Sequence, residues 1–569
     1  MTRFAEILRG RAGQITGSIR AGIDTILPII LIFILALIAV LRFNPRLEYQ
    51  WDDSSYVIAA RAYLNGHGLV YDNDPRFPLA IDRAIGVPFL LIMLFASSGL
   101  YNIVTPKIFI CLLYLLVCLG TYVWLLRRKL FSNTTAFLVA IVFGSSPFVI
   151  EYSHALMAEI PYALFSLLAL SLALAAEQGT HSRRRVALLT IAAAASAVFA
   201  VYLRSIGLSV IIATVLYFIL HKKYRSLIYF FVAVAVLFTG AIAFLGASVG
   251  NPLAGYGYTS GIQNRVSVLV TNAWQYSYEL STVLWNLPFD LLGHLGWQDM
   301  LWSKALLLAI RLFFIVVVFA GIGEMWRRSQ MFLLYGFVYM GVLSLWAYID
   351  AARFLTPIIP IILVCIVFGC EVLCRSTLKF AYSMAVAIKR LSRSQGSQQA
   401  IERMTITWTR YLTSALLILL AASNLFFHLW QATNNHDNVF ANWALIGSTK
   451  GYGQGPEEYF EAALWAKKHL PQHMVIAARS PFDFYLWAER STIEYGWNGG
   501  GEASVLQALE RADIVVEDSY WPQTASLLTP IIRQYPERFQ LLYTADGARP
   551  TNVYRIVRVT AAVPRTVLP

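Results

Sequence analysis

Charged residues are scarce in this sequence. They make up 14% of the 569 residues, against 58% hydrophobic residues, whereas soluble domains carry roughly 25% charged residues. The mean hydropathy is +0.59. So little charge, combined with long apolar runs, excludes an ordinary soluble protein and predicts an α-helical polytopic membrane protein.

Cysteine and acidic residues are also few. The chain has 32 Asp and Glu against 45 Lys and Arg, a formal net charge of +13. The positive charge gathers in short segments between apolar runs, which is typical of cytoplasmic loops and not of a nucleic-acid-binding surface. We therefore expect no nucleic-acid partner. The five cysteines lie in or beside apolar runs, where buried thiols are expected rather than disulfides or a zinc site: Cys111, Cys118, Cys365, Cys370 and Cys374.

The sequence contains no glycine-rich phosphate fingerprint, no P-loop and no repeat of fixed period. In residues 431–569, short apolar runs alternate with helical patterns. Residues 457–470 and 505–511 are predicted helices, and 474–478 and 514–516 are predicted strands, with further strands at Leu541 and 553–559. This alternation predicts a small α/β domain, and a nucleotide site in it is not expected.

The basic clusters predict how the chain crosses the membrane. Residues 23–41 form the first span, and the arginines before it keep the N-terminus cytoplasmic. Residues 86–100 are apolar but shorter than the roughly 20 residues of a spanning helix. If they spanned, residues 127–129, which are Arg-Arg-Lys, would lie outside. We therefore predict a re-entrant or interfacial helix there, about eleven spans in all and a C-terminal region outside.

These observations divide the chain into two predicted domains. Residues 1–430 form the multi-span domain, and residues 431–569 form the extracytoplasmic α/β domain. Within the first, residues 43–106 make a first outer loop with interfacial helices, 249–301 a second large outer loop, and 374–410 a basic cytoplasmic linker. The second outer loop carries aromatic residues that suit either stacking on sugars or an interfacial belt: Tyr256, Tyr258, Trp274 and Trp297.

Three carboxylates are candidates for chemistry on the outer side. Asp52 and Asp53 follow the first span and precede a helical pattern, so either could cap that helix. Alternatively, one of them is a general base, because a water-accessible helix N-terminus keeps a carboxylate ionised. Glu159 begins a later span. A carboxylate there is costly and therefore a functional candidate, unless it is solvated or paired with an arginine or with His154, itself a weaker candidate.

Basic residues stand at the same predicted face. Arg204 interrupts a long apolar stretch and Arg353 opens a span. A guanidinium suits a phosphate because its planar fork donates two parallel hydrogen bonds. The alternative is that each arginine extends to the interface from a helix end. Lys107 is a third candidate, for which that alternative is stronger.

These motifs together resemble those of the GT-C glycosyltransferases, in particular the protein O-mannosyltransferase and aminoarabinose-transferase group. The resemblance rests on WDDSSYVIAARAYLNG (residues 51–66, with the acidic pair and Tyr56), on Glu-Ile-Pro at 159–161, on Arg-Ser-Ile-Gly-Leu at 204–208 and on Arg-Phe-x-x-Pro-x-x-Pro at 353–360. LWAKKHLPQHMVIAARSPFDFYLWAER (464–490) is similar to the outer domain of bacterial members. The sequence departs from the family in having Asp-Asp where Asp-Glu is usual, and Phe-Pro-Leu at 77–79 where Pro-Pro-Leu is frequent.

The resemblance implies an inverting transfer of a sugar from a polyprenyl-monophosphate donor to a hydroxyl of a lipid, glycan or protein. Asp52 would be the base, Asp53 and Glu159 would orient acceptor or sugar, and Arg204 and Arg353 would stabilise the leaving phosphate. Lys107, Tyr56 and His154 complete the predicted substrate-binding set. No cofactor or obligatory metal is expected, because a monophosphate donor needs less help from a metal than a diphosphate donor does. Dependence on a divalent metal stays open.

The implied location is a bacterial-type inner membrane. Two alternatives remain, one of another class and one also an enzyme. A transporter or flippase of lipid-linked sugars would carry charges near mid-membrane and an inverted repeat, and an envelope polysaccharide polymerase or ligase would use a diphosphate-linked glycan. Sugar, acceptor and oligomeric state stay open.

Overall fold

The computed structural model describes residues 25–47, 51–80, 84–177, 182–245, 262–285, 297, 300–345, 351–389, 395–434, 443–496 and 501–558. The chain forms two compact units. The first comprises Met1–Phe43, Asp82–Gly86 and Lys107–Asn438, and the second comprises Asn44–Ile81, Val87–Pro106 and Val439–Pro569. Residues of the predicted first outer loop thus share a unit with the C-terminal sheet.

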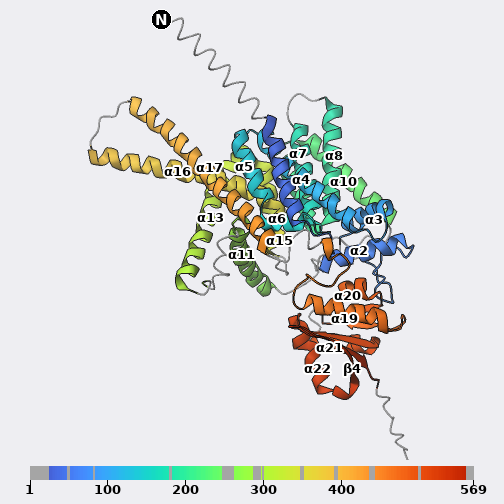
Figure 1. The fold of residues 1–569 in the computed structure, drawn as a ribbon. Coiled ribbons are helices and arrows are strands. Elements are labelled where there is room, and N and C mark those ends of the chain that lie inside the picture. The colour runs from blue at the N-terminus through green and yellow to red at the C-terminus, as the bar shows by residue number, and fades with distance from the viewer. Residues whose placement is uncertain are drawn as a thin grey trace, which may run out of the picture. The chain divides into compact units, whose positions relative to one another are not determined.

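The first unit is built from helices (Figure 1). After the helix Thr25–Arg42 come α4 (Val104–Arg127), α5 (Asn133–Gly144), α6 (Pro147–Tyr152), α7 (Glu159–Glu177), α8 (Arg183–Leu203), η1 (Ser205–Gly207), α9 (Leu208–Leu220), α10 (Tyr224–Leu245), α11 (Ile262–Leu284), α13 (Leu301–Arg328), α14 (Gln330–Ser344), α15 (Ala351–Leu355), η4 (Thr356–Ile358), α16 (Ile359–Lys389) and α17 (Gln395–Asn434).

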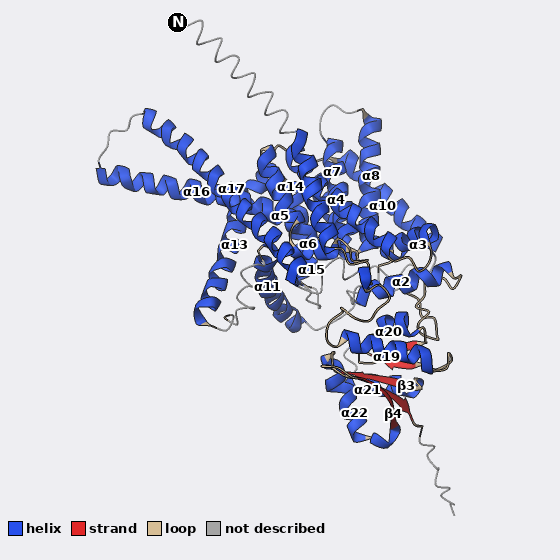
Figure 2. Ribbon diagram, in the orientation of Figure 1, coloured by secondary structure: helices blue, strands red, loops and turns tan. Residues whose placement is uncertain are grey.

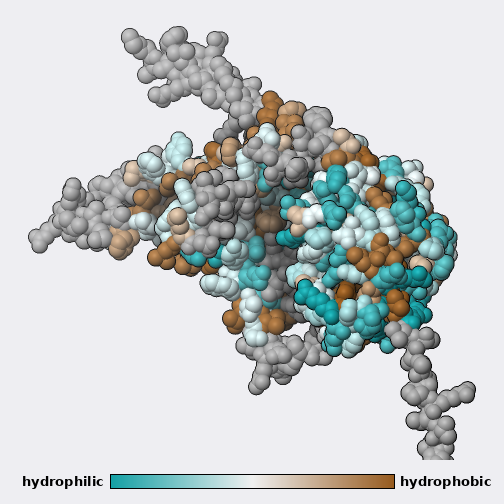
Figure 3. Space-filling view, turned by 60° about the horizontal axis from the view of Figure 1, so that its bottom comes forward, coloured by the Kyte–Doolittle hydropathy of each residue, from teal (hydrophilic) through white to brown (hydrophobic). Residues whose placement is uncertain are grey.

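Many of these helices are apolar enough to cross a membrane. Seven of the described helices have the length and hydropathy of membrane spans, and shorter apolar helices include Asn133–Gly144, Ser205–Leu220, Tyr224–Gly240 and Gln330–Ser344. The predicted first span, 23–41, matches the helix Thr25–Arg42, and the number of apolar helices makes the protein a multi-pass membrane protein. The count of eleven spans stays a prediction. Figure 3 shows hydrophobic residues on the surface of this unit, and α13 alone exposes Leu301, Trp302 and Phe319.

Helices were not expected in two regions of the chain. α11 lies within the predicted second outer loop; polar residues interrupt its apolar pattern, so it gives no signal as a span. α16 and α17 continue as helices into the predicted basic linker. On α11 Trp274 is exposed, as is Trp297 further on, whereas Tyr256 and Tyr258 lie outside the described residues.

Close packing between α13 and α16 requires glycine. A Cβ atom at Gly321 would collide with the carbonyl oxygen of Cys365, and one at Gly369 would collide with that of Val317. The two helix backbones therefore touch where each lacks a side chain, as is common between membrane helices.

The second unit holds all the strands of the described residues (Figure 2). Its elements are α2 (Trp51–Leu64), most of α3 (Gly86–Ser98), α19 (Pro456–His469), β1 (Ile476–Ala478), α20 (Pro481–Ala488), β2 (Thr492–Glu494), α21 (Gly501–Arg511), β3 (Ile514–Asp518), η5 (Thr524–Leu528), α22 (Thr529–Gln534), η6 (Pro536–Arg538), β4 (Phe539–Ala545) and β5 (Thr551–Ile556).

The five strands form one mixed sheet in the order β2-β1-β3-β5-β4. β1 is parallel to β2 and β3, with Ile476 opposite Ile514, and β5 is antiparallel to β3 and β4, with Val516 opposite Val553. Side chains alternate across β3: Ile514 and Val516 join the core under α19 and α20, while Val515 joins the core under α21 and α22. The predicted α/β domain is thus confirmed.

Residues 51–80 pack on this domain. Asn73 pairs with Thr492 at the end of β2, where the Thr492 amide donates to the Asn73 carbonyl oxygen at 2.7 Å. Buried residues of α2, including Ile58 and Ala59, contact Phe482 of α20 and its neighbours. These contacts fix α2 on α20 and so determine the surroundings of the acidic pair.

Candidate functional site

Glu159, at the first position of α7, is fully buried. Its Oε1 atom accepts a hydrogen bond from Arg204 Nη1 at 2.7 Å and another from Arg353 Nε. Both arginines form salt bridges with this one oxygen. Residues distant in sequence are therefore joined in one ionic cluster, which we call the Glu159 cluster (Glu159, Arg204 and Arg353).

Arg204 is held where the chain reverses between two helices. It ends α8 with an extended backbone (φ −154°, ψ 133°), and the single turn η1 then leads into α9. Gly207 makes this reversal possible, because a Cβ there would lie 2.5 Å from the backbone of Ala200. The Arg-Ser-Ile-Gly segment therefore aims the arginine instead of continuing the helix.

Arg353 is held by the broken start of its helix. It lies on the short α15, and η4, with Pro357, separates α15 from α16. Tyr339 Oη donates a hydrogen bond to the carbonyl oxygen of Phe354 at 2.7 Å. The Phe354 ring in turn lies 4.8 Å from the Arg204 guanidinium. Tyr339 thus fixes the backbone next to one arginine and the ring that supports the other.

The Glu159 cluster has an excess of positive charge. One carboxylate faces two guanidinium groups, so the three side chains carry a net charge of +1. Glu159 is inaccessible, whereas the arginine side chains keep 15% and 16% of their surface exposed. The pairing of Glu159 with arginine, an alternative raised by the sequence, is thus observed, and it leaves a partly accessible cationic site suited to an anion.

A second group of basic residues lies in the first unit. Lys107, near the start of α4, is fully buried, and His154 is buried in the loop that leads to Glu159. Burial, together with the charges of Lys107, Arg42 and His428, holds the pKa of His154 well below its usual value. His154 is therefore neutral near pH 7. Neither Arg42 nor His428 belongs to the predicted set of site residues.

Asp52 and Asp53 belong to the second unit. Both are buried and lie in the first turn of α2, which begins at Trp51. They follow the first helical residue, so neither occupies the capping position that precedes it. Ser55 Oγ donates to the carbonyl oxygen of Asp52 at 2.8 Å, and Tyr56 is buried beside them.

A third buried acid of this unit was not among the predicted site residues. Asp483 of α20 is buried and accepts hydrogen bonds from the hydroxyl of Ser54 and, at 2.5 Å, from that of Ser480. Burial raises the pKa of Asp483 to about 6. The spacing Ser-Pro-x-Asp at 480–483 is a signal for an acid in the first turn of a helix, but it does not reveal the contact with α2.

The structure thus gathers the predicted residues in two groups, one in each unit. Glu159, Arg204, Arg353, Lys107 and His154 are in the first unit, while Asp52, Asp53 and Tyr56 are in the second. Among the described residues no three His, Cys, Asp or Glu side chains are placed to hold a metal ion. Metal independence remains a prediction.

Solved structures of membrane glycosyltransferases share this architecture. ArnT from Cupriavidus metallidurans in the apo state is similar with a TM-score of 0.52 at 11% sequence identity, over 92% of this chain and 97% of that chain. ArnT bound to undecaprenyl phosphate gives a TM-score of 0.52 at 12% identity, over the same 92% and 97%. The archaeal oligosaccharyltransferase AglB from Archaeoglobus fulgidus, in complex with an inhibitory peptide and a dolichol-phosphate, gives 0.50 at 13% identity, over 95% and 75%.

Comparison of the sequence with known families and proteins finds no match. No protein-family model matches the chain, and no curated protein does either. ArnT and AglB are both membrane glycosyltransferases of the GT-C superfamily. The fold is therefore of the GT-C type, as the resemblance in the sequence predicted.

Proposed function

We propose that this protein is an inverting glycosyltransferase that moves a sugar from a polyprenyl-monophosphate donor to a hydroxyl acceptor on the outer face of the membrane. The observation that carries the proposal is the Glu159 cluster, in which one buried carboxylate holds two partly accessible guanidinium groups. Support also comes from the GT-C fold and from the neighbours, since ArnT and AglB have been solved with undecaprenyl phosphate and dolichol-phosphate.

Charge matching favours a monophosphate donor. A sugar linked to a polyprenyl monophosphate carries one negative charge, and the phosphate that leaves carries up to two. The Glu159 cluster, with its net charge of +1, complements the donor, and Lys107 adds a further positive charge as the leaving group develops its second negative charge. Such preorganised groups are usually a large part of catalysis, because they cost no reorganisation during the reaction.

The reaction itself is a single displacement. The acceptor oxygen forms a bond to the anomeric carbon while the bond from that carbon to the phosphate oxygen breaks, and the acceptor proton passes to a carboxylate. Asp52 is the proposed base, and Asp53 and Tyr56 orient the acceptor. One displacement at the anomeric carbon inverts its configuration.

The contacts of Glu159 suggest a more specific role than the sequence does. It is fully buried and bonded to Arg204 and Arg353, so we assign it as a positioning residue that orients both arginines toward the donor phosphate. His154, neutral and buried beside Lys107, is assigned to packing against the same region. The proposed location is a bacterial-type inner membrane, with a cytoplasmic N-terminus.

A transfer assay with purified protein in lipid nanodiscs tests the proposal. Radiolabelled sugars on undecaprenyl monophosphate and on undecaprenyl diphosphate are offered with an envelope lipid extract as acceptor. We expect transfer from the monophosphate donor with inversion, and a loss of about 100-fold in Arg353→Gln. Arg184→Gln removes an exposed arginine as a matched control and should leave the rate unchanged.

Two results would contradict the proposal. Transfer from the diphosphate donor alone would favour a polymerase or ligase. Movement of the intact donor between the leaflets of a vesicle, without cleavage of the sugar–phosphate bond, would favour a flippase.

A further inference from the structure

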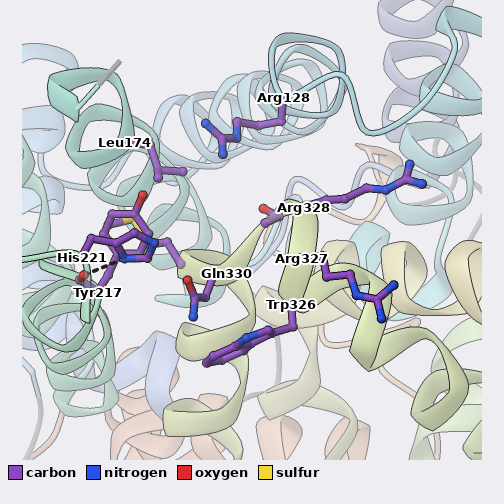
Figure 4. Close-up of a pocket in the computed structure, with 10 residues that line it drawn as sticks. Arg128, Leu174, Tyr217, His221, Trp326, Arg327, Arg328 and Gln330 are labelled. Carbon is purple, nitrogen blue, oxygen red and sulfur yellow. Dashed lines mark hydrogen bonds between the residues drawn. The ribbon is translucent and has the colours of Figure 1, made fainter. Parts of the chain in front are cut away.

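A polar cavity lies among several helix ends in the first unit (Figure 4). It lies where α4 ends, where α9 ends and where α13 passes into α14, whereas the Glu159 cluster lies at the opposite end of α7. The cavity measures about 100 Å³, several times the roughly 30 Å³ that one water molecule occupies in the liquid. It has room for a phosphate group.

Arg128 supplies the cation of this cavity. Its Nε atom is buried and donates no hydrogen bond to any described residue of the chain. The other arginines at the rim are engaged: Arg328 pairs with Glu324 at 2.6 Å, and Arg327 pairs with the same carboxylate at 3.5 Å. In Figure 4 both are directed away from His221. Arg128 is therefore left to meet an anion from outside the chain.

The N-terminus of α14 opens into the same cavity. Ser329 precedes this 15-residue helix but makes no side-chain cap, and its buried Oγ, in the described structure, has no hydrogen-bond partner. The amide groups of the first helical turn are thus not satisfied by a cap, and helix N-termini attract phosphate. Gln330 and His221 line the cavity as additional polar groups.

Carboxylates around the cavity are paired with other groups, as Glu371 is with Arg375 at 3.4 Å. Glu324 binds Arg327 and Arg328, and Glu177 binds Lys223 at 2.9 Å and accepts a hydrogen bond from Ser226 at 2.5 Å. Neither lines the cavity. An anion there would meet positive charge without facing an acid.

An apolar groove continues from this cavity. A second space of about 220 Å³ lies between α4 and α7, and its lining includes Val123, Leu164 and Leu168. Arg128 and Leu174 line both spaces. A polar pocket at a helix end and an apolar groove along the helices therefore join at shared residues, and Leu168 remains partly exposed at the groove.

We propose that the cavity and groove together bind one anionic glycerophospholipid of the membrane. Its phosphate contacts Arg128 and the N-terminus of α14, and an acyl chain follows the groove between α4 and α7. Basic pockets between membrane helices suit anionic head groups, and the adjoining apolar groove explains why a lipid, rather than a free phosphate, is the ligand. This site is independent of the proposed transfer reaction.

Binding to the purified, delipidated full-length protein tests the proposal. Native mass spectrometry and thermal unfolding are recorded with phosphatidylglycerol, with phosphatidylcholine and with glycerol phosphate. We expect one tightly held phosphatidylglycerol that raises the unfolding temperature, weaker binding of phosphatidylcholine, and no effect of glycerol phosphate at the same concentration.

Matched variants locate the site. Arg128→Gln should weaken phosphatidylglycerol binding about fivefold, whereas Arg184→Gln, which removes an exposed arginine, should not. Leu168→Trp narrows the groove without changing any charge, so it should also weaken lipid binding. This variant tests the site independently if the Arg128→Gln protein does not fold. Equal binding of the two phospholipids, binding unchanged in both Arg128→Gln and Leu168→Trp, or binding of glycerol phosphate as strong as that of the lipid would overturn the proposal.

Discussion

Arg204 Nη1 lies 2.7 Å from Glu159 Oε1, and Arg353 donates to the same oxygen. An isolated buried pair of this kind would be neutral, whereas the second arginine gives the group a positive charge. Burying these charges is costly unless each is paired. These charges are buried at the N-terminus of α7, where the proposed donor phosphate would be bound.

The first prediction concerns the carboxylate of this cluster. Glu159→Gln leaves two buried guanidinium groups without their anion, so we expect a loss of about 3 kcal/mol in the free energy of unfolding together with a loss of transfer activity. Glu371→Gln is the control, because Glu371 is 23% exposed and pairs with Arg375 at 3.4 Å. It should cost no more than about 1 kcal/mol. Thermal unfolding in nanodiscs compares the two, and equal stability of both variants would contradict the role given to Glu159.

The second prediction concerns Asp483 and pH. Burial raises the pKa of its carboxyl from 3.8 to about 6, so the folded protein keeps a proton that the unfolded chain releases. The stabilisation is complete below about pH 4 and is lost as the pH rises through about 6, a decrease of about 3 kcal/mol. The difference in unfolding temperature between wild type and Asp483→Asn, measured from about pH 4 to 7, should follow this decrease. Parallel curves would show that Asp483 ionises normally.

The third prediction concerns the short helix Gly86–Ser98. Its 13 residues extend about 20 Å, less than the roughly 30 Å of a bilayer core. We expect it not to span, which puts Lys129 in the cytoplasm. In a protein whose native cysteines are replaced by alanine, Lys129→Cys should react with an impermeant thiol reagent only after permeabilisation. Labelling of intact cells would mean that the helix crosses the membrane.

How much the sequence reveals differs between elements. Long apolar runs such as those of α4 and α13 are predictable because a helix in lipid must satisfy its own backbone and present apolar side chains. α11 escaped prediction because its apolar residues occupy only part of its surface. β2 is only three residues long and is stabilised by its neighbour β1 and by Asn73, which no local pattern records.

The candidate site was predictable only in part. Glu159, Arg204 and Arg353 stood out because charge is rare in apolar stretches, but that both arginines bind one carboxylate oxygen depends on how α7, α8 and α15 pack. Asp483 lies in the α/β domain, where acids are more frequent than in the apolar helices, so its burial against Ser54 had no signal in the sequence.

The acidic pair of α2 gives the most direct measurement of the central claim. Asp52→Asn and Asp53→Asn leave the size and shape of the side chain almost unchanged, so folding should be preserved. In a transfer assay with an undecaprenyl-monophosphate-linked sugar, we predict that Asp52→Asn lowers the rate by at least about 100-fold, with a smaller loss in Asp53→Asn. Full activity of both variants would contradict the assignment of the catalytic base to this pair.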